Sequence, residues 1–414
     1  MRAKGPPTVR MLPAAYPRAD RFIMPASPDL TSSDPVARLH AALATVIDPE
    51  IRKPITDLDM VGRVEVEDET AHVVIKLTIV GCPAARSIER AVRAAVLSVP
   101  GITRDEVTIT VMTPAERSAL TERLRAGRGA QTAQFGPDSL TRVYAVTSGK
   151  GGVGKSTLTA NLAVELATRG LSVGLIDADV FGFSIPGILG LVHDGVTQPP
   201  TRVGEMILPP VAHGVKVISI GMFLEGTDAA SRAVSWRGPM LHRTIQQFLT
   251  DVFFGDLDVL LLDLPPGTGD VAISIGQLLP QAEVLVVTTP QPAAAEVAER
   301  SGIVARQTGQ SVLGVVENMA GVELPDGQRL SIFGEGGGAE VARRLSAGQQ
   351  HAVPLLASVP LSVALREGGD SGQPLVISTP EDPAAHAIKT VADVLGQRQR
   401  GLAGRSLPFT TAHG

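Results

Sequence analysis

Cysteine and aromatic residues are both scarce in this sequence of 414 residues, which holds one cysteine, Cys82, and only 3% aromatic side chains. A single thiol excludes an intramolecular disulfide and is typical of proteins from reducing compartments. No apolar run reaches the roughly 20 residues that a membrane-spanning helix needs, so we expect a soluble, cytoplasmic protein. We expect no membrane partner for the same reason. The formal charge of −5 lacks the basic excess of nucleic-acid-binding proteins, so we do not expect nucleic acid as a partner either.

Lysine is also scarce. The 37 basic side chains include only seven lysines, yet two of these, Lys150 and Lys155, lie in the same short segment. A chain that otherwise prefers arginine therefore concentrates lysine at one place, which indicates that the amine itself is needed there. Hydrophobic residues make up 44% of the chain, so it is globular and long enough for two or three domains.

Composition and periodicity divide the chain into segments. Residues 1–32 hold six prolines and no apolar core, so we expect them to be disordered. After this tail the sequence predicts a small α+β domain at 33–115, a polar linker at 116–140, a larger domain at 141–398 and a flexible tail at 399–414.

The small domain has the pattern of an α-β-β-α-β unit. Asp34 and Pro35 form a suitable cap and first turn for a helix that carries Leu39 and Leu43 on its apolar face. The following elements are expected at 61–66 (strand), 72–79 (strand), 84–97 (helix) and 107–111 (strand).

The larger domain alternates short apolar strands with helices. The strands are expected at 143–146, 173–176, 259–262, 284–287, 312–316 and 355–359. Strands that are apolar on both faces are typical of buried parallel sheets. The predicted fold class is therefore α/β, with a mostly parallel, doubly wound sheet that follows the small α+β domain.

A glycine-rich loop follows the first strand of the larger domain. The segment 149–156 satisfies the pattern G-x-x-x-x-G-K-[ST], and a helix that continues to about Arg169 begins there. Glycines let consecutive backbone N–H groups point at a phosphate, and the start of the helix adds its positive end. Lys155 would reach the β- and γ-phosphates, and Ser156 would ligate Mg²⁺. The sequence thus predicts a P-loop ATPase that uses ATP and Mg²⁺.

Three carboxylates follow two of the predicted strands. Asp177 and Asp179 come at the end of the strand 173–176, and Asp263 ends the apolar run in DVLLLDLPPGTGD. Carboxylates at the carboxyl ends of parallel strands face the phosphate-binding crevice. An apolar strand that finishes in aspartate is the Walker B arrangement, in which the carboxylate holds Mg²⁺. We therefore expect Asp177 and Asp263 to join Ser156 at the metal.

The glycine-rich loop resembles the deviant Walker A motif of the ParA/MinD/nitrogenase-iron-protein ATPases, and the wider pattern resembles the Mrp/ApbC branch, the iron–sulfur cluster carriers. The stretches that carry the resemblance, over about 141–395, are SGKGGVGKST (148–157), DADVFGFSIP (177–186), WRGPM (236–240), DLPPGTGD (263–270), TTPQ (288–291), VVENM (315–319) and IFGEGGG (332–338). The first domain resembles a small iron–sulfur-assembly domain often fused in front of this ATPase, through DPE (48–50), MV (60–61) and TIVGCP (78–83).

The resemblance implies a role for each matching residue. Lys150 corresponds to the signature lysine, which in a homodimer reaches across to the partner's phosphates as an arginine finger would. Asp179 would position the attacking water. The expected catalytic residues are therefore Lys150, Lys155 and Asp179. Asn318 would contact the adenine. The expected ATP-binding residues are Gly149, Lys150, Gly151, Gly152, Val153, Gly154, Lys155, Ser156, Thr157 and Asn318.

The sequence departs from the family at the cluster site. Carriers of this family commonly hold Cys-Pro-x-Cys after the ENM stretch, but residues 319–328 here contain no cysteine. Cys82 is the only remaining candidate for an iron–sulfur ligand, and a dimer would offer two such thiols. Two interpretations stay open. Cys82 is either a small buried hydrophobe, or a ligand whose pKa is lowered at the start of a helix. The eight histidines show no zinc-like spacing.

The leading hypothesis is a homodimeric, Mg²⁺-dependent ATPase that binds iron–sulfur clusters or helps to load them onto apo-proteins. One alternative is a MinD- or ParA-like positioning ATPase, although the end of the chain, broken by glycine and proline, lacks a basic amphipathic helix. Another is an ATP-dependent regulatory scaffold that holds no cluster of its own, in which residues 33–115 recruit a client.

Overall fold

The computed structural model describes residues 34–79, 82, 84–126, 134–136, 139–180, 182–204, 206–223, 238–323, 329–347, 349 and 351–397. The two predicted tails, at 1–32 and 399–414, lie outside these residues, as do Trp236 and the segment 324–328. Among the helices that are described, none is both long and apolar enough to cross a membrane.

The small domain is the α-β-β-α-β unit that the sequence predicts. Its elements are α1 (Pro35–Leu43), β1 (Val61–Glu67), β2 (Thr70–Leu77), α2 (Ala85–Leu97) and β3 (Arg104–Val111). Asp34 caps α1, because its side chain accepts a hydrogen bond of 2.9 Å from the Val36 N–H. β2 is the central strand, antiparallel to β1 and parallel to β3. The core between sheet and helices includes Leu39, Val73 and Val92.

Helix α3 (Pro114–Ala126) corrects the prediction that a linker begins at residue 116. Its start is a capping box: the Thr113 N–H donates to Glu116 Oε2 at 2.7 Å, and the Glu116 N–H donates to Thr113 Oγ1 at 3.3 Å. Leu120 and Leu124 are buried on its inner face. The sequence hid this helix because only two apolar residues, four positions apart, mark its packed side.

The larger domain is built on an eight-stranded sheet in the order β10-β11-β5-β12-β4-β13-β14-β17. The strands are β4 (Arg142–Ser148), β5 (Val173–Asp177), β10 (Val211–Ala212), β11 (Val215–Ser219), β12 (Val259–Asp263), β13 (Glu283–Thr288), β14 (Ser311–Asn318) and β17 (Leu355–Val359). All six predicted strands are present and parallel to their neighbours, whereas β10 pairs antiparallel with β11. The predicted α/β class is confirmed.

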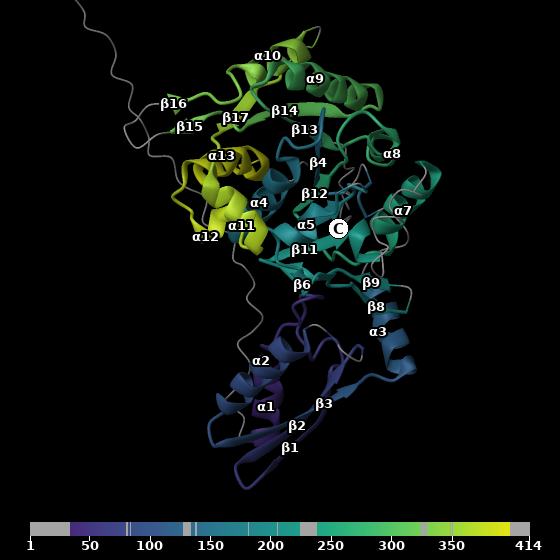
Figure 1. Cartoon of the computed structure of the whole chain (residues 1–414). Helices are drawn as coiled ribbons and strands as arrows, with labels where there is room; N and C mark the ends of the chain where they lie inside the picture. Colours follow the sequence, from purple (N-terminus) through teal and green to yellow (C-terminus); the bar gives the residue numbers. More distant parts are fainter. Residues whose placement is uncertain are drawn as a thin grey trace, which may run out of the picture.

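Helices cover both faces of this sheet (Figure 1). One layer holds α4 (Lys155–Thr168), α5 (Ser184–Ile188), α11 (Val363–Ser371), α12 (Leu375–Ser378) and α13 (Pro383–Gln397). The other holds α7 (Gly238–Asp251), α8 (Asp270–Leu278), α9 (Pro292–Gln307) and α10 (Gly337–Ser346). The small hairpin β15 (Val322–Glu323) and β16 (Arg329–Leu330) lies beyond β14.

A run of short strands between β5 and β12 was missed by the sequence analysis. It comprises β6 (Val192–His193), β7 (Val196–Thr197), β8 (Thr201–Val203), β9 (Met206–Leu208), β10 and β11, followed by the 3₁₀ turn η1 (Ile220–Phe223). Most of these strands have only two or three residues, too few to show a period of two. They matter because β11 pairs directly with β5 and places Ser219 opposite Asp177.

The two domains share a hydrophobic core at the β8–β9 hairpin, which lies between them in Figure 1. Val203, Met206 and Leu208 of this hairpin belong to the same buried cluster as the small domain's core. Thr121 of α3 donates a hydrogen bond of 3.3 Å to the Val203 carbonyl, and the Arg52 guanidinium donates to the Gly214 carbonyl. The small domain is therefore packed against the larger one rather than tethered to it.

Candidate functional site

The glycine-rich loop joins β4 to α4, as predicted, and two glycines give it its shape. Gly152 and Gly154 both have positive φ angles, 77° and 79°. A Cβ at Gly154 would lie 2.2 Å from Nδ2 of Asn318, whereas a Cβ at Gly152 would meet nothing within 4 Å. The conformation thus favours glycine at both positions, and close packing also demands it at Gly154.

The loop is also held at its first residues. A Cβ at Gly149 would lie 2.3 Å from the backbone of Val297 and Ala298, so the loop rests directly on α9. On the other side the Gly267 N–H donates a hydrogen bond of 2.7 Å to the Ser148 carbonyl. The loop is therefore fixed between α9 and the PPGTG turn that follows β12.

Lys155 lies buried at the centre of the site, 5% exposed. Its Nζ is 2.8 Å from Oδ2 of Asp263 and 3.6 Å from Oδ2 of Asp179. Ser156 donates a hydrogen bond of 2.5 Å to the same Asp263 oxygen, and Thr159 donates one of 2.9 Å to the other. The predicted loop lysine, hydroxyl and Walker B carboxylate are thus in direct contact.

Asp177 lies beside Asp263, because β5 and β12 pair in a register that puts the two residues opposite each other. Asp177 accepts hydrogen bonds from Ser219 Oγ at 2.9 Å and from the Asp179 N–H at 3.1 Å. Burial, followed by the charge of Asp263, raises the pKa of Asp177 well above its ordinary value. Two buried carboxylates with one lysine leave a deficit of positive charge.

The donor set fits Mg²⁺. A hard cation takes oxygen ligands, and Mg²⁺ commonly uses one or two carboxylates together with phosphate oxygens and water. Ser156, Asp177 and Asp263 supply a hydroxyl and two carboxylates of this kind. In the part of the chain that is described, no group of three or more His, Cys, Asp or Glu side chains could hold a metal ion by itself.

A cavity of about 380 Å³ opens above the loop. It is lined by Ser148, the loop residues 150–157, Asp179, Gly182, Ser184 and Pro266. Most of these residues are glycine, serine or threonine, and both Lys150 and Lys155 are among them. Such a lining suits phosphates.

Lys150 lines the same cavity and is held within its own chain. Its Nζ donates a hydrogen bond of 2.9 Å to Oε1 of Gln291, the residue that precedes α9. Sequence reasoning did not identify Gln291 as a functional residue. The only available signal was its place in the TTPQ stretch, which says nothing of which side chain it meets.

Asn318 is 96% buried under the loop, where its Nδ2 donates a hydrogen bond of 2.8 Å to the Val153 carbonyl. It therefore supports the loop from below. Its contact with adenine stays a prediction.

Cys82 is buried in the core cluster of the small domain. Burial, together with the charge of Glu50, raises the pKa of its thiol to about 11. The expectation of a lowered pKa at a helix start is therefore wrong, because desolvation and nearby carboxylates outweigh the hydrogen bonds that Cys82 makes to the first backbone groups of α2. Its place in the core fits the interpretation as a small buried hydrophobe.

The DPE segment lies at the junction of the domains. Asp48 Oδ1 accepts hydrogen bonds from the Glu50 and Ile51 N–H groups at 2.9 and 2.8 Å. Glu50 in turn accepts one of 3.2 Å from Thr201 of β8. Burial and the charge of Asp48 raise the pKa of Glu50 to about 7. This motif thus contributes to docking of the small domain.

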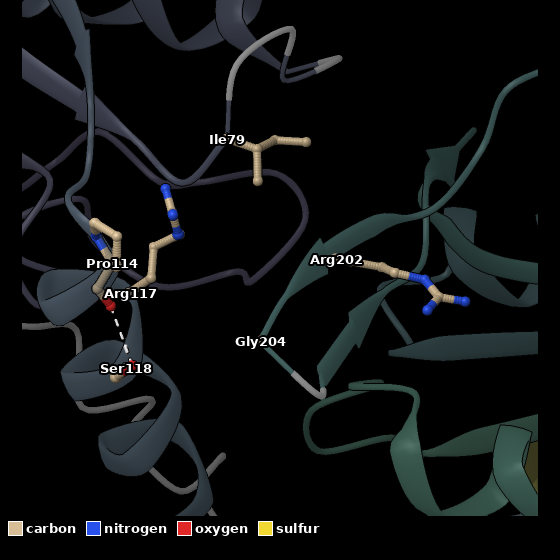
Figure 2. Close-up of a pocket in the computed structure, with 6 residues that line it drawn as sticks. All are labelled: Ile79, Pro114, Arg117, Ser118, Arg202 and Gly204. Atoms are coloured by element: carbon tan, nitrogen blue, oxygen red, sulfur yellow. Dashed lines mark hydrogen bonds between the residues drawn. The ribbon is translucent and has the colours of Figure 1, made fainter.

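A second cavity, of about 490 Å³, lies between the domains (Figure 2). It is lined by Ile79, Pro114, Arg117, Ser118, Arg202 and Gly204. Both guanidinium groups have other contacts: Arg117 donates to the Met112 carbonyl at 2.8 Å, and Arg202 lies 5.8 Å from the centre of the Phe223 ring. Figure 2 shows the two groups on opposite walls, with Arg202 directed away from Arg117. None of the predicted nucleotide-binding residues lies here.

The parallel sheet, the glycine-rich loop and the contact of Lys155 and Ser156 with Asp263 define the larger domain as a P-loop NTPase. The family profile of the NUBPL iron-transfer P-loop NTPases matches residues 139–395, and that of the iron-sulfur cluster assembly proteins matches residues 37–109. The chain therefore belongs to the NUBPL iron-transfer P-loop NTPase family, with an iron-sulfur cluster assembly domain in front. The predicted family resemblance is confirmed.

Relatives match nearly the whole chain. A protein of Mycobacterium tuberculosis (strain ATCC 25618 / H37Rv) named iron-sulfur cluster carrier protein is 56% identical over 373 residues, 90% of this chain and 96% of that protein. One of the same name from Bacillus subtilis (strain 168) is 38% identical over 321 residues, 76% and 84% of the two chains. Among solved structures, a nucleotide-binding protein in complex with ADP from Archaeoglobus fulgidus is 37% identical, with a TM-score of 0.47 over 56% of this chain and 86% of that one.

Proposed function

We propose that this protein is a cytoplasmic, Mg²⁺-dependent ATPase that carries or assembles iron–sulfur clusters and helps to load them onto apo-proteins. The observation that carries the ATPase part is the contact of Lys155 and Ser156 with Asp263 beneath the phosphate loop. The cluster part is supported by the shared name of relatives that match most of the chain.

In this proposal the phosphate loop binds ATP through its backbone N–H groups, and Lys155 leaves Asp263 to contact the β- and γ-phosphates. Ser156, Asp177 and Asp263 hold Mg²⁺, which, when bound, neutralises charge on the phosphate oxygens. Asp179, whose carboxylate lies 3.6 Å from the lysine amine, orients the attacking water. The low exposure of Lys155 and Asp263 keeps bulk water from their charges.

The active form in this proposal is a homodimer in which Lys150 acts on the partner's nucleotide. The cavity supports this, because Lys150 is one of its lining residues and is only half-buried, whereas Lys155 is buried. A cation supplied by a second chain stabilises transition-state charge only when the two chains are in contact. ATP hydrolysis is therefore coupled to dimer formation.

Cys82 is the candidate ligand for the cluster, since it is the only thiol in the chain. A ligand must be a thiolate, and burial beside Glu50 opposes ionisation of this thiol. Cluster binding there therefore requires a rearrangement of the small domain. The same observation favours a second candidate function, an ATP-driven scaffold that directs cluster transfer between partners without holding a cluster.

The test is transfer of a cluster to an apo-protein. Full-length protein is incubated anaerobically with iron and sulfide, then mixed with an apo-ferredoxin, and holo-ferredoxin is followed by its visible absorption. We expect transfer to accelerate with Mg²⁺ and ATP in wild type and not in Lys155→Ala. Equal transfer by both proteins, with and without ATP, would remove the link between the nucleotide site and cluster handling.

A further inference from the structure

The contact between Lys150 and Gln291 points to a restraint on the proposed trans-acting lysine. Lys150 Nζ and Gln291 Oε1 are 2.9 Å apart within one chain. A lysine that serves the partner's nucleotide has to release this bond first. The structure therefore shows Lys150 in a position that differs from the one its proposed role requires.

Gln291 contacts Lys150 from the start of α9. It is the residue before the first turn of α9, and Pro292 follows at the first helical position. The side chain of Gln291 makes no hydrogen bond to the first N–H groups of α9, a role that short side chains such as Ser, Thr, Asn and Asp usually fill. Its carbonyl oxygen accepts from Lys150 instead.

Both ends of the contact are held by backbone. On the lysine side, Gly149 packs against the backbone of α9, where a Cβ would lie 2.3 Å from the Ala298 nitrogen. On the glutamine side, Gly337 packs against the carbonyls of Thr289 and Pro290, where a Cβ would lie 2.6 Å from each oxygen. The loop that carries Lys150 is thus packed against α9, and the turn that carries Gln291, which leads directly into α9, is packed against the start of α10.

We propose that Gln291 is a positioning residue that holds Lys150 against its own chain until a nucleotide-loaded second copy arrives. This inference rests on the proposed function, since it assigns regulation to the same ATP site. A neutral amide suits a contact that must later be broken. Its hydrogen bond holds the lysine amine in place but is weaker than the bond that a carboxylate would make. The two restraints in a dimer are released together, which discourages pairing of chains that lack nucleotide.

Two substitutions at Gln291 are expected to act in opposite directions. Gln291→Met keeps the length of the side chain and removes the acceptor, whereas Gln291→Glu turns the contact into an ion pair. Gln373→Met, at an exposed glutamine whose side chain makes no hydrogen bond that the structure shows, is the matched control. All variants are made in the full-length chain.

The first readout needs no nucleotide. Lysine amines are labelled briefly with an acylating reagent, and modification of Lys150 is measured by mass spectrometry against Lys53, an exposed lysine of the small domain. One hydrogen bond corresponds to roughly a threefold to tenfold change in an equilibrium. We expect Lys150 to be labelled about threefold faster in Gln291→Met, more slowly in Gln291→Glu, and unchanged in Gln373→Met.

The second readout is self-association with Mg²⁺ and ATP, followed by sedimentation. Because each dimer releases two restraints, the midpoint concentration is expected to fall about tenfold in Gln291→Met and to rise in Gln291→Glu. A purely structural role would weaken association in both variants.

Two results would overturn the proposal: equal labelling of Lys150 in wild type and Gln291→Met, or weaker association in Gln291→Met. The second would make Gln291 a contributor to the dimer rather than a restraint. If wild type does not associate with Mg²⁺ and ATP at all, the proposed dimeric ATPase fails, and labelling alone decides whether Gln291 holds Lys150.

Discussion

Ser219 donates a hydrogen bond of 2.9 Å to Asp177, and this bond joins strand β11 to a candidate magnesium carboxylate. The same strand carries Lys216, whose positive charge lowers the pKa of Asp48 and Glu50 in the small domain, although burial raises both overall. A single buried strand of five residues thus contacts the nucleotide site at one end and the domain junction at the other. Strand β11 thus links the iron-sulfur cluster assembly domain to the ATP site.

Substitution of Lys155 is expected to affect stability as well as binding. Lys155→Ala removes the cation from two carboxylates, Asp177 and Asp263, that have no exposed surface. Removing one partner of a buried ion pair costs about 3–5 kcal/mol. We expect Lys155→Ala to abolish tight ATP binding, measured by calorimetry, and to unfold at a lower temperature.

Adding Asp263→Asn to Lys155→Ala tests whether the lost stability comes from the broken ion pair. Lys155→Ala with Asp263→Asn removes both charges, so the double variant is expected to recover part of the lost stability without recovering ATP binding. A double variant that is less stable than Lys155→Ala would show that the ion pair is not what the lysine contributes.

Lys150→Ala is expected to separate binding from turnover. Lys150 makes no contact with Asp177, Asp263 or Ser156 that the structure shows, so nucleotide affinity is expected to stay within about threefold of wild type. Turnover is expected to fall by about 10³-fold, the range of an arginine finger, together with ATP-driven association. Normal ATP hydrolysis by this variant, in a steady-state phosphate-release assay, would contradict the trans-acting role.

Gly154 and Gly152 form a matched pair for the phosphate loop. Their φ angles are 79° and 77°, in the left-handed region. Alanine at either position is therefore expected to destabilise the folded chain by about 1 kcal/mol through its backbone conformation. Only Gly154→Ala also drives a Cβ to 2.2 Å from Nδ2 of Asn318. We therefore expect Gly154→Ala to lose more stability in chemical denaturation and more ATP affinity than Gly152→Ala. Equal losses would mean that Asn318 yields easily.

Glu50 is expected to make the domain junction sensitive to pH. Its pKa in the folded chain is about 7, raised by burial and by Asp48, against an ordinary value of 4.5. Because the folded state favours the protonated acid, this contribution is fully present below pH 4.5 and is lost as the pH rises through 7. The groups that face Glu50 are Asp48, Thr201 of β8, Lys216 of β11 and Cys82.

The measurement is urea denaturation of wild type and Glu50→Gln at pH 5 and pH 8. Between pH 5 and pH 8, ionisation of Glu50 is expected to lower the unfolding free energy of wild type by up to about 3 kcal/mol. Glu50→Gln has no such group, so its unfolding free energy is expected to fall by about that much less over the same pH range. Identical pH dependence of the two proteins would show that Glu50 does not titrate in this range.

Much of the fold was predictable because its strands are buried on both faces. Runs such as 173–177 and 259–263 are continuously apolar up to a terminal aspartate, so strand position and the location of Asp177 and Asp263 follow from the sequence alone. The phosphate loop was predictable because its glycines and lysine serve backbone geometry and charge, which are local requirements.

The rest depends on contacts between distant segments. Lys216 is an isolated lysine in the sequence, and only the folded chain shows that it is buried and acts on the carboxylates of Asp48 and Glu50. The sequence left two interpretations of Cys82 open for the same reason, since the carboxylate of Glu50 approaches its thiol through the fold and not along the chain. The partner of Lys150 is 141 residues away.

The most direct test of cluster binding by this chain is the iron and sulfide content after anaerobic reconstitution, compared between wild type and Cys82→Ser. Far-ultraviolet circular dichroism of both proteins controls for folding. The account predicts iron and acid-labile sulfide in stoichiometric amounts in wild type and background amounts in Cys82→Ser. Background amounts in both proteins would contradict a carrier role and leave an ATPase that serves cluster assembly without holding the cluster.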